Sequence, residues 1–184
     1  DSAISVALYP RDLPAGIDCQ RCHGPGGRHV DLARRRETAL PDVQSSIVNP
    51  ARLPPARQMD ICMQCHLEAT SDGAWEALVA FGRGVFSLRP GEALSDYRRH
   101  FDFPPGPSPS DRFDIAHQAY RLRQGACCRR SAGRRTCTTC HDPHRRPERP
   151  KEYFMAKCLG CHEREDCGPG HEAAARGAGE GCID

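Results

Sequence analysis

Cysteine and histidine recur along this chain at one fixed spacing. Four Cys-x-x-Cys pairs are each followed at once by a histidine, in the strings CQRCH, CMQCH, CTTCH and CLGCH. Histidine is only 9 of the 184 residues, so four chance matches in succession have a probability of roughly six in a million. Two thiols at this spacing can form thioethers to the two vinyl groups of one haem, and the adjacent imidazole can bind its iron.

These strings, called motifs one to four in chain order, therefore predict four covalently bound haem c groups. The predicted thioether residues are Cys19, Cys22, Cys62, Cys65, Cys137, Cys140, Cys158 and Cys161. The predicted proximal iron ligands are His23, His66, His141 and His162.

Zinc ribbons and thioredoxin-like redox pairs also use Cys-x-x-Cys and are the main alternatives. A zinc site of four cysteines would leave the four histidines that follow the pairs without a role. A thioredoxin fold alternates strands and helices, and no such alternation surrounds any of the pairs. The spacing therefore favours haem over both alternatives.

Five histidines outside the motifs are candidates for the distal position on the irons: His29, His100, His117, His144 and His171. His117 has the best local support, because residues 110–125 are typical of a helix that ends at Gly125 and places His117 on its apolar face. His29 follows a Gly-Pro-Gly-Gly turn, after which a short helix can return its imidazole toward a haem.

The other candidates are more open. His144 lies three residues after His141, too close to reach the far side of the same haem, so we expect it to bind the iron of a neighbouring haem. His100, between aromatic residues, is equally compatible with a ligand and with a packed or surface residue. His171 lies in a glycine-rich tail, which favours a residue that binds no iron. The rival methionine ligands are Met59, Met63 and Met155, of which the first two are expected to pack.

The elements that must position these residues are predicted to be short. Hydrophobic residues make up 38% of the chain and aromatics 6%, while 16 prolines and 17 glycines interrupt most long helices or strands. We expect a mainly irregular chain with a few short α-helices and little or no β-structure, organised around its haems. The interval from Ala39 to Gln58, with four prolines, is expected to be irregular.

The motifs divide the chain into two pairs. The sequence predicts an N-terminal two-haem part over residues 1–103, a proline-rich linker over 104–110 and a C-terminal two-haem part over 111–184, which together form one compact unit or a portion of a longer chain. Only 16 residues separate His141 from Cys158. The last two haems are therefore expected to be near neighbours.

The charge pattern argues against nucleic-acid binding. The formal net charge is +2, and arginine runs occur at 34–36 and within 129–135, but no aromatic residues or reading helix accompany them. The eight propionates of four haems would take the net charge to about −6 before the ferric irons add positive charge, and would give the arginines natural partners. No apolar stretch reaches the roughly 20 residues that a membrane span needs, so we expect no membrane span.

Several stretches together resemble the multihaem cytochromes that are often joined to tetratricopeptide repeats in bacteria. They are CHGPGGRH, NPARLPPARQMDICMQCH, the segment from FDIAHQAYRLR to CTTCHDPH, and CLGCHE. More distantly, the chain is similar to the tetrahaem cytochromes of nitrifying bacteria and to extracellular cytochrome filaments. The resemblance supports His29 and His144 as distal ligands and implies a loop-rich fold organised by haem packing. The family's repeats and upstream haem segment have no counterpart here.

The other four cysteines have no assigned partner: Cys127, Cys128, Cys167 and Cys182. One of the vicinal pair Cys127 and Cys128 is expected to be free or disulfide-bonded, or else a buried thiol. Cys182, Ile183 and Asp184 have the form of a haem motif cut after its third residue, so a fifth haem is expected if the chain continues. The alternative is a disulfide from Cys182 to Cys167, Cys127 or Cys128.

These features predict an electron carrier rather than an enzyme, with redox proteins as partners, located in the periplasm or outside the cell of a bacterium or archaeon. Bis-histidine ligation would leave no vacant iron for a substrate. Two alternatives stay open. One is the protomer of a conductive filament formed by self-association, and the other is an oxidoreductase that acts on a small nitrogen compound at one open haem.

Overall fold

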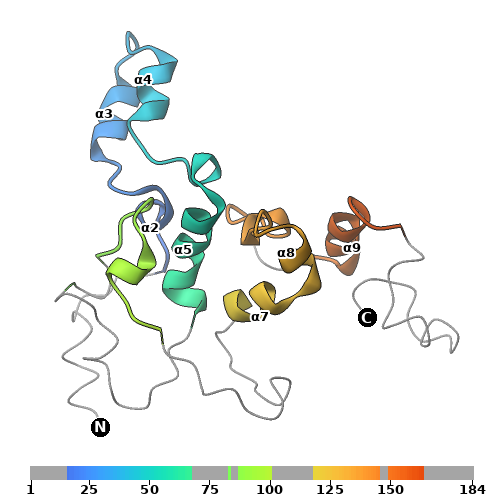
Figure 1. The fold of residues 1–184 in the computed structure, drawn as a ribbon. Coiled ribbons are helices and arrows are strands. Elements are labelled where there is room, and N and C mark those ends of the chain that lie inside the picture. The colour runs from blue at the N-terminus through green and yellow to red at the C-terminus, as the bar shows by residue number, and fades with distance from the viewer. Residues whose placement is uncertain (1–15, 68–82, 84–86, 101–117, 146–148, 164–184) are drawn as a thin grey trace, which may run out of the picture. The chain divides into compact units, whose positions relative to one another are not determined.

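The computed structural model describes residues 16–67, 83, 87–100, 118–145 and 149–163 (Figure 1). Most of these residues lie in helices, and none of them forms a β-strand. The expected absence of strands is therefore confirmed for these ranges, while the expectation of a mainly irregular chain underestimates the helix content.

The chain divides into two compact units, residues 1–135 and 136–184. The described helices of the first unit are α2 (Cys19–His23), α3 (Gly27–Arg34), α4 (Leu40–Ser45), α5 (Pro55–His66), α7 (Gln118–Gln124) and α8 (Ala126–Arg130), with 3-10 turns η1 (Pro50–Arg52) and η2 (Leu94–Asp96). The second unit contains the 3-10 turn η4 (Cys137–Thr139) and helix α9 (Lys151–Leu159). Each unit therefore carries two of the four motifs.

The interval between motifs one and two is the clearest correction to the sequence prediction. Its prolines predict an irregular segment, but it contains α4, η1 and the start of α5. Pro41, Pro50 and Pro55 all lie in the first turn of one of these elements. Proline is tolerated there because the N–H groups of a first turn have no partner within the helix. These prolines therefore start helices rather than interrupt them.

Helix α5 forms the centre of the first unit. Its residues Met59, Ile61 and Met63, and Leu67 directly after it, are 3% to 8% exposed. The turn around η2 and helix α7 both pack against α5, and α8 packs against α7. These neighbours add the buried residues Leu88, Leu94, Tyr97, Ala119 and Cys128. Within the described residues the core is small, and three of its nine apolar members, Met59, Met63 and Cys128, contain sulfur.

The boundary between the two units follows Arg135, whereas the sequence places a linker at 104–110, which lies outside the described residues. Helix α7 ends before Gly125, where the sequence predicts the end of a helix. The first residues of that predicted helix and His117 also lie outside the described ranges. No helix within those ranges is long and apolar enough to cross a membrane.

Candidate haem attachment sites

All four Cys-x-x-Cys-His motifs adopt a helical turn. Motif one forms the whole of α2, and motif two forms the last turn and a half of α5. In motifs three and four the histidine N–H donates to the carbonyl of the first cysteine, at 2.9 Å for His141 and 3.0 Å for His162. A turn of this kind brings residues i, i+3 and i+4 to one side. Each motif therefore presents its two thiols and its imidazole to the same side of the backbone.

Motif one has a defined start and end. The side chain of Asp18 accepts a hydrogen bond from the Arg21 N–H at 3.1 Å and caps the helix. Gly24 ends the helix with φ of 79°, a conformation that favours glycine. The chain can therefore leave the motif directly after His23 and begin α3 shortly afterwards.

The ring of His23 is held by a distant segment of the chain. Its Nδ1 atom lies 2.8 Å from the carbonyl oxygen of Val48. A carbonyl can only accept a hydrogen bond, so Nδ1 must carry the proton. In the neutral ring this leaves the lone pair on Nε2, the arrangement in which a metal-binding histidine is commonly held.

His29 is held in the same way by the end of α4. Its Nδ1 atom lies 3.0 Å from the Val43 carbonyl oxygen and 3.1 Å from Ser46 Oγ. The Ser46 hydroxyl donates to the same carbonyl at 2.6 Å, so its proton is already used. Nδ1 of His29 is again the donor, and Nε2 carries the lone pair. Two of the predicted ligands are thus fixed in the tautomer that suits iron.

The backbone around these two rings leaves large apolar side chains in contact with solvent. Ile17 is 74% exposed, Leu40 66% and Val30 43%. Ile17 lies two residues before Cys19, and Val30 follows His29. Single exposed apolar side chains are common on protein surfaces, so these three residues do not by themselves indicate a ligand.

Motifs one and two lie next to each other. The Gln64 amide of motif two donates to the Arg21 carbonyl of motif one at 3.4 Å, and Arg98 donates to the Gln64 carbonyl at 3.0 Å. Burial raises the pKa of the Cys22 thiol above its ordinary value, and the neighbouring Cys65 thiol adds to the rise. The attachment points of the first two predicted haems are therefore neighbours.

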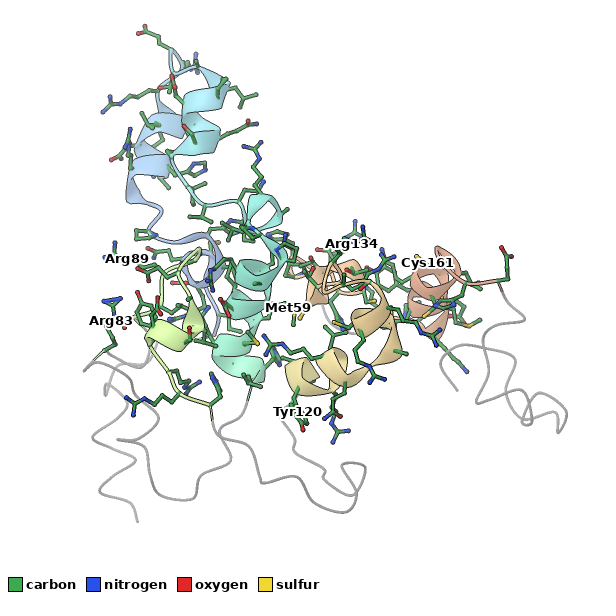
Figure 2. The ribbon with its side chains drawn as sticks, viewed as in Figure 1. Met59, Arg83, Arg89, Tyr120, Arg134 and Cys161 are labelled. Carbon is green, nitrogen blue, oxygen red and sulfur yellow. The ribbon has the colours of Figure 1, made fainter. Side chains whose placement is uncertain are left out.

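Motifs three and four are also connected within the second unit. The ring of His141 packs edge to face on Phe154 of α9, with 5.6 Å between ring centroids. Helix α9 leads directly into motif four (Figure 2, which labels Cys161). This contact agrees with the expected proximity of the last two haems, which the short spacing predicts.

The described residues place three of the five distal candidates. His29 is held as above. His144 is 75% exposed, its N–H donates to Asp142 Oδ1 at 3.0 Å, and Arg145 pairs with the same carboxylate. The Nε2 atom of His100 is buried, and His100 interacts with neighbouring residues. His117 and His171 lie outside the described ranges.

The cysteines are compatible with thioether formation. None of the ten cysteines within the described ranges forms a disulfide. This set includes all eight predicted thioether residues and also Cys127 and Cys128, of which Cys128 is buried. Cys167 and Cys182 lie outside these ranges. The same part of the chain contains no group of three or more His, Cys, Asp or Glu residues placed to hold a metal ion by themselves.

Three functional positions were missed by the reasoning from sequence: Val43, Ser46 and Val48. Two of them act through backbone carbonyls, which leave no signal in the residue type. They lie 14 and 25 positions from the rings that they hold. Ser46 was the one of the three whose side chain could have suggested a hydrogen bond to a histidine, but it lies in a segment whose prolines predict irregular structure.

Comparison with known proteins adds no assignment to this geometry. No protein-family model, no curated protein and no solved structure matches the chain.

Proposed function

We propose that this chain is a multihaem c-type cytochrome that transfers electrons through four closely spaced haems. The observation that carries the proposal is the common helical turn of the four Cys-x-x-Cys-His motifs, which presents two thiols and an imidazole together each time. The tautomers of His23 and His29 support it, because each ring directs its lone pair to Nε2. Haem iron supplies the one-electron chemistry by changing between the ferrous and ferric states.

The residues of the chain have distinct roles in this proposal. The eight motif cysteines anchor the haems, and His23, His66, His141 and His162 bind the irons from one side. His29, His100, His117, His144 and His171 are the candidates for the other side. The carbonyls of Val43 and Val48 fix the rings that they contact. Because the described core is small, the haems would also serve as its main apolar filling and organise the fold.

The proposed setting is the periplasm or the cell surface of a bacterium or archaeon, with other redox proteins as partners. Haem c attachment belongs to such compartments, and the resemblance to tetratricopeptide-associated multihaem cytochromes points the same way. Two histidines on each iron would keep the reduction potentials low and exclude substrates from the metal.

The test is expression in a bacterial host that attaches haem c in its periplasm. We expect four haems per chain by intact mass and by haem absorbance, and a low-spin ferric spectrum by electron paramagnetic resonance. A Cys19→Ala, Cys22→Ala variant should lose one haem and retain three. Zinc in place of haem, or a predominantly high-spin spectrum, would contradict the proposal. Electron micrographs of the purified protein separate a soluble carrier from a filament.

A further inference from the structure

A strongly basic segment of the first unit, formed by α7, α8 and the turn after α8, lies outside the four motifs. It carries Arg121, Arg123, Arg129, Arg130, Arg134 and Arg135, and we call the exposed side of this segment the α7–α8 basic surface. The sequence contains no aspartate or glutamate between residues 115 and 141. All six arginines are exposed except Arg135, which is half-buried. Positive charge is therefore concentrated here although the whole chain is nearly balanced.

The backbone gathers these arginines from consecutive elements. Helix α8 follows α7 after Gly125 and packs against it. After α8 the chain turns back, and Ala132 and Gly133 have positive φ angles of 52° and 71°. The turn is closed by the Arg134 N–H and its Nε, which both donate to the Ser131 carbonyl at 3.1 Å. Figure 2 labels Arg134 beside α8 and Tyr120 on α7.

Ordinary helix capping does not account for this concentration. Arginines in the last turn of a helix interact favourably with its carbonyl end, which can account for two arginines in each of α7 and α8. It does not account for Arg134 and Arg135, which follow α8 outside any helix. Arg123, Arg129 and Arg130 form no ion pair with any of the described residues. By contrast, the run at 34–36 has acidic neighbours at positions 31 and 37.

The position of this surface connects it to the proposed electron path. Helix α7 packs against α5, and α5 ends in motif two. A protein bound to α7 and α8 would therefore lie one helix away from a haem attachment motif. Charged surfaces of this kind speed the encounter of partners with the opposite charge.

We infer that the α7–α8 basic surface is the docking surface for an acidic electron-transfer protein. The role of this surface in electron transfer rests on the proposed function, but the binding of an acidic protein does not require haem chemistry. The two can therefore fail separately. Haem propionates of the same chain and nucleic acids are the rival occupants, and both are outcomes of the test.

The binding test uses poly-L-glutamate as an acidic probe and the haem-loaded chain in isothermal titration at low salt. The variant is Arg123→Gln, Arg129→Gln, Arg130→Gln, and the matched control is Arg34→Gln, Arg35→Gln, Arg36→Gln. Both remove three positive charges. We expect the dissociation constant to rise about tenfold or more in the first variant, and less than about twofold in the control. The conservative triple variant R123K, R129K, R130K keeps the three positive charges and should bind the probe like the native chain.

Electron transfer provides a second readout. The dithionite-reduced protein is mixed with ferricyanide, and each ferrous iron passes one electron to one ferricyanide to give ferric iron and ferrocyanide. At low salt the α7–α8 glutamine variant should react about tenfold more slowly than the native chain. The difference should vanish at 1 M salt, where the Debye length is about 3 Å. Cationic hexaammineruthenium(III) should show the opposite change.

Three results would overturn the inference. Equal effects of the two glutamine variants would mean that only net charge matters. No binding of poly-L-glutamate by the native chain would mean that these arginines are already neutralised, as by propionates. Tighter binding of a DNA duplex than of poly-L-glutamate at equal charge would assign the surface to nucleic acid. Loss of haem from the native chain would instead contradict the proposed function and leave the binding result valid.

Discussion

At His23 and His29, a backbone carbonyl decides which ring nitrogen carries the proton. Val48 and Val43 provide these carbonyls, and both come from the short stretch that ends α4 and follows it. A hydrogen bond at Nδ1 orients an axial ring and raises its basicity toward a metal. The stretch from 43 to 48 therefore fixes the tautomer of two candidate ligands.

His29 should bind iron. In a His29→Ala variant we expect about one haem in four to change from low-spin to high-spin ferric iron, because one distal ligand is lost. Electron paramagnetic resonance of the oxidised protein measures this change. An unaltered low-spin spectrum with all haems retained would show that His29 is not a ligand.

Ser46 should matter more than its neighbour Ser45. Ser46→Ala removes contacts to both Val43 and His29, so we expect the free energy of unfolding to fall by about 1–2 kcal/mol. Ser45→Ala removes one exposed contact to Asp42 and should stay within about 0.5 kcal/mol of the native chain. Denaturant unfolding followed by circular dichroism compares the two. Equal losses would argue against a special role for Ser46.

Helix α5 combines two functions at the scale of a single element. Met59, Met63 and Leu67 are spaced four residues apart and buried. Cys62, Cys65 and His66 form another set at i, i+3 and i+4, and the last two are exposed. One helix therefore supports the core and presents motif two. Substitutions in the buried set should lower stability, whereas substitutions in the motif should remove the second haem.

Met63 should affect stability and not iron ligation. Met63 is 3% exposed, so Met63→Ala should lower the free energy of unfolding by about 2–4 kcal/mol. Met155→Ala, at a half-buried position of α9, should cost less. If Met63 were an axial ligand, Met63→Ala would change the reduction potential of one haem. Voltammetry measures these potentials, and we expect no such change.

The proximity of motifs one and two should appear as magnetic coupling. The Cys65 thiol contributes to the raised pKa of Cys22, and such an effect requires the groups to lie within several ångströms. We therefore expect broadened paramagnetic resonance signals from the first haem in the oxidised protein. A Cys62→Ala, Cys65→Ala variant, which lacks the second haem, should sharpen them. Identical line widths in both proteins would contradict this arrangement.

The sequence predicted the local parts of this structure better than the distant ones. The end of α7 at Gly125, which the sequence predicted, follows from neighbouring residues, whereas the helical turn at each motif was not predicted. The contact of His23 with the Val48 carbonyl joins residues 25 positions apart. Every residue has a backbone carbonyl, so the residue type cannot predict which one acts as acceptor. The prolines misled because proline breaks a helix interior yet favours a first turn. The boundary after Arg135 depends on the packing of α7 against α5, which spacing alone does not reveal.

At the scale of the whole molecule, a larger unit over residues 1–135 and a smaller one over 136–184 carry two motifs each. Hydrophobic residues make up only 38% of the chain, and chains with small cores commonly need cofactors or covalent links to fold. The haem-free chain is therefore expected not to fold.

Loss of the third haem should damage the second unit first. In a Cys137→Ala, Cys140→Ala variant, the contact of His141 with Phe154 loses its support, so residues 136–184 should become expanded or be degraded. Limited proteolysis with mass spectrometry should place the first cuts after Arg135. Native compactness by small-angle scattering, without this haem, would contradict the proposed dependence on the cofactor.

The hold of Val43 and Val48 on the two rings has a consequence for how this sequence can change over generations. A carbonyl is the same whichever side chain stands beside it, so many residue types can replace both valines without loss of either bond. An insertion or deletion between His29 and Val43 is different, because it changes the number of residues between each imidazole and the carbonyl that it contacts. In this stretch, substitution of the two valines should therefore be tolerated better than insertions or deletions.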